Sequence, residues 1–332
     1  MRNGKRAAAV LAVLLCVMMT ISAFAELTTK ETTKNGKPLE VTWVDEDGNT
    51  ATGPDGYATV KYQYSRDSVT ETYFDTEGAP VAVNGGYFGK TVIRDGRKRI
   101  TEIIYLDRNG RIAMNDERYA RMTIHYTSFD AVSKLSYFGI DKKRTLVPSL
   151  GYAAMECDYR GKTLTKRSYL DASGQLTDTA MGYAAMIQKV NKKNQVTGIS
   201  YEHADGRPAT CLDGWSSCEI ELDKKGRILS TKYYTEDGRL TDRGAGYAWE
   251  QTVYNENEER VTRYDLKGNP VTRDEGYTTL VRVRKNDLIV KEYFLDENGA
   301  KIENADGAGA LIYEYDDDGN IINIEEEPLG SK

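Results

Sequence analysis

The feature that most constrains this 332-residue chain is a repeat of about 32 residues that runs through most of its length. Glycines recur at steps of 30 to 32 residues, with Lys142 in the one position that lacks glycine. They are Gly48, Gly78, Gly110, Gly174, Gly206, Gly238, Gly268 and Gly299. An aromatic residue follows seven of them at a distance of nine residues. Two columns at fixed spacing predict a tandem array of one small unit.

Each unit has the pattern of two β-strands joined by turns. Ala120, Met122, Ile124 and Tyr126 alternate with polar residues, as expected for a strand with one buried face. Aspartate followed within a few residues by glycine, as in 223–226, marks a tight turn, because one position of such a turn requires a positive φ. A threonine-rich strand then leads into the next unit. The sequence therefore predicts one β-hairpin per unit.

A single hairpin cannot bury its apolar side alone, but hairpins stacked edge to edge can. No segment after residue 25 has a convincing helical periodicity. We therefore expect an all-β fold, an elongated array of about nine units of ~32 residues that forms a twisted or spiral antiparallel sheet or solenoid. The pattern leaves open whether the sheet is an open ribbon or a closed solenoid.

The array is predicted to form one domain over residues 35–326, because no proline- or serine-rich linker divides it. Asn35-Gly36 is placed where the last turn of a preceding unit would lie. Residues 26–34 are polar and are expected to form a flexible lead-in, and residues 327–332 a C-terminal tail.

The first 25 residues have the pattern of a signal peptide. Arg2, Lys5 and Arg6 precede an apolar run, and Ala23-Phe24-Ala25 provides the small residues that a signal peptidase requires. We expect cleavage before Glu26, with an uncleaved membrane anchor as the alternative. No later segment is apolar for more than a few residues, so the mature chain is expected outside the membrane, either secreted or associated with the cell envelope.

Four cysteines are present, and Cys16 lies within the signal peptide. The three that remain allow at most one internal disulfide. Cys211 and Cys218 are seven residues apart around a predicted chain reversal, so a disulfide between them is possible. Cys157 is predicted to face inward as a small buried residue.

Residues 313–321, with the sequence Tyr-Glu-Tyr-Asp-Asp-Asp-Gly-Asn-Ile, resemble a Rhs/YD-type repeat, and residues 264–269 are a second partial match. Residues 233–238, continued by Gly246-Tyr247, are more loosely similar to the hairpins of bacterial cell-wall (choline-type) binding repeats. This resemblance covers nearly all of the chain after the signal peptide. It implies an exported bacterial surface or envelope protein built of β-hairpins.

The 23 tyrosines fall into periodic columns, and such regularity predicts that most of them pack within the sheet. A site that stacks on sugar rings would use exposed members of the column that follows glycine, together with a tryptophan. The candidate ligand-binding residues are therefore Trp215, Trp249, Tyr247, Tyr183 and Tyr277.

No metal or cofactor is expected. Residues 314–325 space their acidic side chains nearly as an EF-hand loop does, but the first ligand is Glu and the flanks are predicted strands. His125 and His203 each stand alone and are predicted on the surface. Without residues 1–25 the chain has 42 Lys and Arg against 51 Asp and Glu, and this negative charge argues against nucleic acid as a partner.

The chain contains no nucleophile elbow, zinc-protease helix or phosphate-binding glycine loop. We therefore expect a non-enzymatic protein that binds a cell-wall or extracellular polysaccharide through many weak contacts. The alternative is a scaffold for protein–protein interaction or adhesion, with a surface protein as its partner. A polysaccharide-active enzyme is a second alternative, because a glycosidase needs only two carboxylates at a fixed separation.

Overall fold

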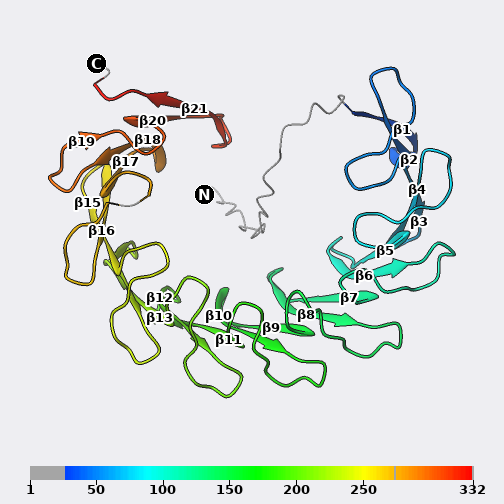
Figure 1. Ribbon diagram of the computed structural model, residues 1–332, viewed down its shortest axis with the longest axis horizontal. Helices are drawn as coiled ribbons and strands as arrows, with labels where there is room; N and C mark the ends of the chain where they lie inside the picture. The colour runs from blue at the N-terminus through cyan, green and yellow to red at the C-terminus, as the bar shows by residue number, and fades with distance from the viewer. Residues whose placement is uncertain (1–26, 273, 331–332) are drawn as a thin grey trace, which may run out of the picture.

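The computed structural model describes residues 27–272 and 274–330, which form one curved β-sheet of 21 strands (Figure 1). The sheet follows the outline of a C, and the first and last hairpins lie on the two sides of its opening. No helix capable of spanning a membrane occurs in this part of the chain. The predicted all-β array of tandem hairpins is confirmed.

The strands are short, and most have six to eight residues. They are β1 (Thr28–Lys34), β2 (Lys37–Val44), β3 (Thr59–Tyr64), β4 (Ser68–Phe74), β5 (Gly89–Arg94), β6 (Ile100–Leu106), β7 (Arg121–Tyr126), β8 (Val132–Phe138), β9 (Ala154–Arg160), β10 (Thr163–Leu170), β11 (Ala185–Val190), β12 (Val196–Glu202), β13 (Ser217–Leu222), β14 (Ile228–Tyr234), β15 (Trp249–Tyr254), β16 (Glu258–Tyr264), β17 (Thr279–Lys285), β18 (Leu288–Leu295), β19 (Lys301–Ile302), β20 (Ala310–Tyr315) and β21 (Ile321–Glu327).

The strands pair antiparallel in the order of the chain. Within a hairpin β3 pairs with β4, and across the junction to the next hairpin β4 pairs with β5. This alternation continues to β18, which pairs with β20 across the last junction, and β20 pairs with β21. The two-residue strand β19 pairs with the end of β18. The free edges of the sheet are therefore β1 and β21.

The segment 28–34, expected within a flexible lead-in, is strand β1. It pairs with β2 along its whole length through a turn at Asn35 and Gly36, whose φ angles are 52° and 71°. Asn-Gly is the preferred sequence of a two-residue hairpin turn, because both positions need a positive φ. The lead-in prediction was therefore wrong for these residues. The predicted signal peptide, residues 1–25, lies outside the described residues.

The connections between strands differ on the two edges of the sheet. Hairpin tips, which join the two strands of one hairpin, are tight turns, whereas the connections between successive hairpins are longer segments such as 75–88, called excursions here. Neighbouring excursions bond to each other at several junctions: the Asn84 amide donates to the Asp55 carbonyl at 3.0 Å, and the Asp116 amide to the Gly85 carbonyl at 2.9 Å. Because the excursions add a layer of chain to one edge only, that edge forms the wide outer rim of the C (Figure 1).

The aspartates of the acidic turns accept hydrogen bonds from backbone amides of the same turn. Asp107 Oδ1 accepts the amides of Asn109 and Arg111 at 2.8 and 2.9 Å, and Asp316 Oδ1 those of Asp318 and Asn320 at 3.0 and 2.8 Å. This is the hydrogen bonding of an Asx turn. The EF-hand-like segment is therefore a hairpin tip whose first aspartate is occupied by its own backbone. Among the described residues, no group of three or more His, Cys, Asp or Glu is placed to hold a metal ion.

We expect these turns to make the fold sensitive to acid. The Arg111 amide holds the pKa of Asp107 below its usual range, and the Asn320 side chain does so for Asp316. A carboxyl whose pKa is lower in the folded state contributes stability above its unfolded pKa of about 3.9 and loses it as the pH falls through the folded value. The melting temperature should therefore drop below about pH 4. A variant with Asp107→Asn, Asp265→Asn and Asp316→Asn keeps the acceptors and should show a shallower acid decline; an unchanged profile would contradict this origin.

A continuous row of aromatic rings, called the aromatic ladder here, forms the core along the excursion edge. A ring from the end of a hairpin alternates with a ring that follows a glycine in the excursion, and successive centroids are 4.4 to 6.1 Å apart. The rings are Tyr57, Tyr73, Tyr87, Tyr105, Tyr119, Tyr137, Tyr152, Tyr169, Tyr183, Tyr201, Trp215, Tyr233 and Tyr247. Tilted and edge-to-face contacts at these distances are favourable. The ladder couples each unit to the next.

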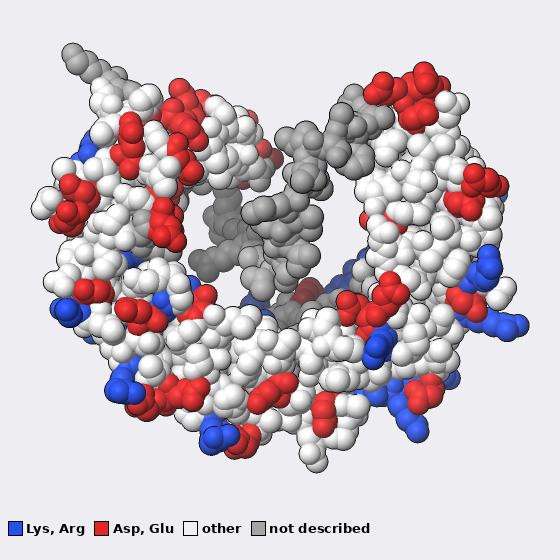
Figure 2. All heavy atoms as spheres, in the orientation of Figure 1, with Lys and Arg blue, Asp and Glu red and all other residues white. Residues whose placement is uncertain are grey.

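Acidic side chains concentrate at both ends of the C (Figure 2). Residues 27–88 contain 5 Lys and Arg against 10 Asp and Glu, and residues 250–330 contain 9 against 20. Like charges on the two sides of the opening repel each other. Strands β1 and β21 each pair with one neighbour only, so the sheet formed by the described residues is an open ribbon, the choice that the sequence pattern left open.

Candidate functional site

Four of the five predicted ligand-binding residues are core residues. Trp215, Tyr247, Tyr183 and Tyr277 expose only 7, 2, 8 and 9% of their surfaces. The first three belong to the aromatic ladder, and Tyr277 stacks on Phe294 at 4.8 Å. A ring enclosed on both sides by its neighbours has no face to offer a sugar. The prediction that exposed members of this column form a ligand site was therefore wrong.

Trp249 is the exception, because it is only half-buried. Its ring stacks on Tyr264 with centroids 4.0 Å apart and planes 12° apart, and the Lys232 ammonium lies 5.9 Å from its centroid. The two rings come from the paired residues at the ends of β15 and β16. Trp249 thus packs on its own hairpin, apart from the four buried residues.

The possible disulfide between Cys211 and Cys218 is absent: both are free thiols, as is Cys157. Cys218 is buried with Trp215, and Cys211 packs against the same cluster. Burial raises the pKa of Cys218 to about 11, so little of the reactive thiolate forms at neutral pH. These cysteines serve as small apolar side chains.

The aromatic ladder is interrupted once, by Arg263. This residue occupies the position at the end of β16 that Tyr233 occupies in β14. Its guanidinium lies 5.3 Å from the Tyr247 ring and 5.9 Å from the Tyr277 ring, so it bridges the two parts of the core by cation–π contacts. Its charge is met by Glu250, whose Oε1 is 3.0 Å from Arg263 Nε. The arginine of an ion pair thus takes the place of one aromatic ring in the aromatic ladder.

We expect Arg263→Tyr to lower the free energy of unfolding by about 1–3 kcal/mol, because Glu250 loses its ion-pair partner while partly buried. Adding Glu250→Val should recover the loss, since other units place apolar residues such as Leu280 there. Denaturant unfolding of both variants, with Glu250→Val alone as the control, measures the coupling. Equal stability of Arg263→Tyr and the wild type would show that the ion pair contributes nothing.

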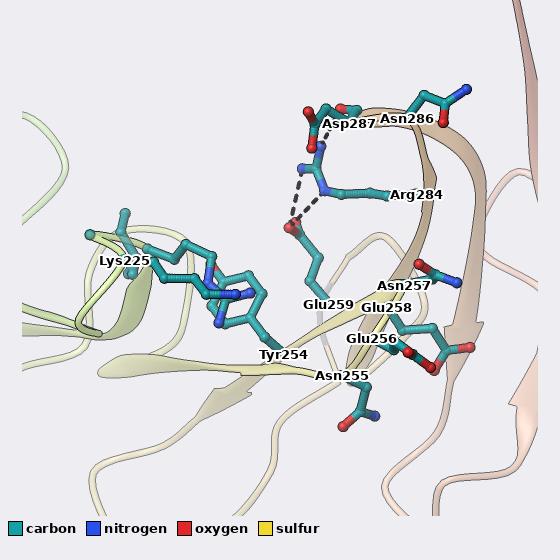
Figure 3. A pocket seen from close by; sticks show the side chains of 13 residues that line it. Lys225, Tyr254, Asn255, Glu256, Asn257, Glu258, Glu259, Arg284, Asn286 and Asp287 are labelled. Carbon is teal, nitrogen blue, oxygen red and sulfur yellow. Dashed lines mark hydrogen bonds and ion pairs between the residues drawn. The ribbon is translucent and has the colours of Figure 1, made fainter.

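A groove of about 720 Å³ lies on the hairpin-tip edge (Figure 3). Three consecutive tips form it: residues 225–228 before β14, 254–259 between β15 and β16, and 284–287 between β17 and β18. Lys225 and Tyr254 lie on one side, and Arg284 with Glu259 on the other (Figure 3). The lining is mainly polar and carries three asparagine amides, two arginines and several carboxylates.

The side chains that fill the space between neighbouring tips differ along the sheet. At some junctions a tyrosine near the end of the first strand contacts the preceding hairpin, whereas β5, β11 and β13 have Arg94, Val190 and Leu222 at that position. The hydroxyl of Tyr126 donates to the Ile100 carbonyl at 2.7 Å, and that of Tyr159 to the Val132 carbonyl at 2.8 Å. The Tyr254 ring lies under the guanidinium of Arg227, which is 4.0 Å from the ring centroid, as the Tyr126 ring lies under Arg99 at 4.5 Å. Arg284 then takes the tyrosine position in the following hairpin.

Arg284 is held by a buried carboxylate at the floor of the groove. Glu259 is 8% exposed, and its Oε2 accepts from Arg284 Nη2 at 3.1 Å while its Oε1 accepts from Arg282 Nη1 at 2.9 Å. Arg282 also donates to Glu292 at 2.7 Å. A fully paired cluster of this kind fixes side chains, because each buried charge has its partner. The groove therefore has a rigid floor and exposed amides at its rim.

No family model and no curated protein matches the chain. Among solved structures, the chain is similar to a mutant Tc holotoxin pore of Photorhabdus luminescens, with a TM-score of 0.25 and 9% identity. It is also similar to TcdB2-TccC3, with a TM-score of 0.23 and 11% identity, and to TcdB2-TccC3-TEV, with 0.27 and 11%.

These matches cover 88 to 90% of this chain. The chain spans only 15 to 19% of the length of those larger chains. All three TM-scores are low and mark a loose likeness.

Proposed function

We propose that this is an exported, non-enzymatic repeat protein that binds a polysaccharide of the cell envelope or the extracellular space. The observation that carries the proposal is the polar groove on the hairpin-tip edge. Three consecutive tips form there an open surface with a fixed floor.

The chemistry of the groove suits a sugar. Asn255 and Asn257 are exposed at its rim, and an amide can donate to one hydroxyl and accept from another. Burial raises the pKa of Tyr254, so its hydroxyl remains protonated and able to donate at neutral pH. The groove is open, as a site must be if a polymer is to enter it sideways.

The ion pairs within the groove support binding rather than hydrolysis. A glycosidase needs one carboxyl that gives a proton to the leaving oxygen and a second that acts as nucleophile or base. The buried carboxylate, Glu259, has both oxygens occupied by arginines. Export is supported by the signal-peptide pattern of residues 1–25, and N-terminal sequencing of the secreted protein should begin at Glu26.

A pull-down with purified cell-wall and glycan fractions tests the proposal. The wild type should be retained on at least one polysaccharide, and Asn255→Ala with Asn257→Ala should weaken binding about tenfold. Two lost hydrogen bonds of about 0.5–1.5 kcal/mol each give a change of this size.

Asn109→Ala is the matched control, because this exposed asparagine lies in an excursion on the opposite edge. It should bind as the wild type does. Retention on none of the fractions, or equal binding by the groove variant, would refute the proposal.

A second candidate function, a protein-interaction scaffold, is favoured by the free edge strand β21. Ile321, Ile322 and Ile324 on this strand expose 52, 65 and 51% of their surfaces. An open edge with apolar side chains can accept an extended segment of another protein as an additional strand. A partner recovered with the wild type and lost with Ile322→Lys and Ile324→Lys would establish this alternative.

A further inference from the structure

The alternation of hairpins and excursions sorts the connections onto two opposite edges of the sheet. Because every strand pairs antiparallel with the next, all hairpin tips lie along one edge and all excursions along the other. The groove is part of the tip edge. Four consecutive tips precede the groove in the sequence, and a fifth forms part of it. The five tips are residues 94–100, 126–132, 160–163, 190–196 and 222–228.

These five tips, called the basic row here, are strongly positive on a protein that is negative overall. They contain 11 Lys and Arg against 3 Asp, whereas the nine excursions after β2 contain 12 Lys and Arg against 24 Asp and Glu. All the cations of the row except Arg99 are exposed. The exposed ones are Arg94, Arg97, Lys98, Arg160, Lys162, Lys192, Lys193, Lys224, Lys225 and Arg227. The two edges therefore carry opposite charge.

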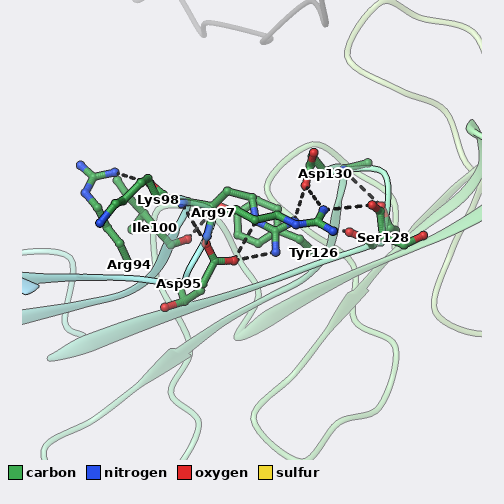
Figure 4. Close-up of polar contacts among 12 residues, drawn as sticks. Arg94, Asp95, Arg97, Lys98, Ile100, Tyr126, Ser128 and Asp130 are labelled. Atoms are coloured by element: carbon green, nitrogen blue, oxygen red, sulfur yellow. Dashed lines mark hydrogen bonds and ion pairs between the residues drawn. The ribbon is translucent and has the colours of Figure 1, made fainter. Parts of the chain in front are cut away.

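Contacts within the first tip and with the second hold the arginines of the first tip in fixed positions (Figure 4). Arg97 Nη1 donates to Asp130 Oδ1 at 2.9 Å and to the Ser128 carbonyl at 3.1 Å. Arg99 binds Asp95 through two nitrogens, at 2.8 and 2.6 Å, and its guanidinium lies 4.5 Å from the Tyr126 ring. Four cations, counting Arg94 and Lys98, face two carboxylates, so an excess of positive charge remains at ordered positions.

The basic row is regular and continuous with the groove. Two strands per unit, each about 4.8 Å wide, place successive tips about 10 Å apart, so the five tips extend over roughly 40 Å. The last of them supplies Lys225 and Arg227 to the groove. A linear polymer that lies in the groove and continues toward the N-terminal end of the sheet therefore meets a cation-bearing tip at nearly every step.

We propose that the basic row binds the anionic groups of the same polymer, so that the ligand is an anionic polysaccharide. This inference rests on the proposed function and specifies its ligand. The groove holds sugar hydroxyls, and the row attracts carboxylates or phosphates attached to the polymer. Many weak ion pairs along one chain add through effective concentration, and exposed pairs of this kind weaken as salt is added.

The row does not suit nucleic acid. Binding of single strands depends on aromatic rings on which the bases stack. At these tips the hydroxyls of Tyr126 and Tyr159 bond to the backbone of the preceding hairpin, and Arg99 lies over the Tyr126 ring.

Polygalacturonate and its fully methyl-esterified form are suitable probes, because they share a backbone and differ in charge. Binding of the whole protein is measured by interferometry at about 50 mM and 200 mM salt. The wild type should bind the charged polymer at least tenfold more tightly at low salt, and the difference should shrink at high salt. Lys162→Glu, Lys192→Glu and Lys193→Glu together should abolish the difference.

Lys142→Glu, Lys143→Glu and Lys267→Glu together change the net charge equally on the excursion edge and should leave the preference intact. If the wild type bound both polymers equally and Asn255→Ala with Asn257→Ala weakened that binding, the role of the basic row would be refuted. The proposed function would remain supported. Equal binding of polygalacturonate, polyglutamate and duplex DNA would overturn both. Binding of neither polymer would overturn the proposed ligand class.

Discussion

Tyr169→Ala should lower the free energy of unfolding by about 3–5 kcal/mol, the usual cost of removing a large buried aromatic side chain. Tyr169 exposes 3% of its surface in the middle of the aromatic ladder. It contacts Tyr152 at 4.8 Å and Tyr183 at 6.0 Å, so the substitution opens a cavity and breaks two ring contacts. Because units of a linear array are stable only beside their neighbours, the loss should weaken the junctions on both sides.

Urea unfolding followed by far-ultraviolet circular dichroism measures this effect. Tyr169→Phe retains the ring and should cost less than about 1.5 kcal/mol. Tyr64→Ala removes a half-buried tyrosine from the hairpin-tip edge and should also have a small effect. If Tyr169→Ala and Tyr64→Ala were equally stable, the aromatic ladder would not be the main source of cohesion between units.

Gly151→Ala is expected to cost about 2–4 kcal/mol, for two separate reasons. The φ angle of Gly151 is +77°, which costs an L-residue about 1–2 kcal/mol. An added Cβ would lie 2.9 Å from the Ala180 nitrogen and 3.1 Å from the Thr179 Cα. These are backbone atoms of the next excursion, which cannot rotate away as a side chain could, so the two excursions must separate.

Gly110→Ala separates the two contributions. Its φ is +75°, but an added Cβ there meets no atom within 4 Å. It should therefore show only the cost of the backbone conformation, about 1–2 kcal/mol. Thermal unfolding of the two variants measures the difference. Equal losses would mean that the close approach of neighbouring excursions does not contribute to stability.

The repeat could be predicted from the sequence because glycine and aromatic residues serve the same purpose in each unit. A glycine such as Gly110 supplies a positive φ at a turn, and the aromatic nine residues later enters the core. Both requirements are local to a unit and recur with it. Strand β1 was missed because its seven residues are polar and exposed, and only its pairing with β2 identifies it.

The ligand site could not be predicted in the same way. Tyr183 and Tyr277 occupy a column that could face solvent or the core, and the sequence does not show where the excursion folds relative to the sheet. The groove is formed by side chains of three tips, among them Arg284, and the equivalent position holds tyrosine in some hairpins and Arg94, Val190 or Leu222 in others. Aligning the ends of the first strands places Arg284 at a hairpin tip, but it does not show that Glu259 lies beneath this arginine.

The charge of the two edges illustrates the same limit. Lysines such as Lys162 and Lys192 are visible in the sequence, as is the excess of acid in the whole chain. Their meaning depends on which turns share an edge, and this follows only once the order of strand pairing is known. The net charge of the whole chain sums the charges of both edges, so the positive charge of the basic row is not visible in it.

Hydrogen exchange with and without a bound cell-wall polysaccharide tests most directly which edge of this ribbon binds. The account predicts slower exchange in the hairpin tips between residues 94 and 228 and in the groove tips 254–259 and 284–287. Exchange in the excursions, such as 139–153 and 203–216, should be unchanged. Protection confined to the excursions, or binding without protection at any tip, would contradict it.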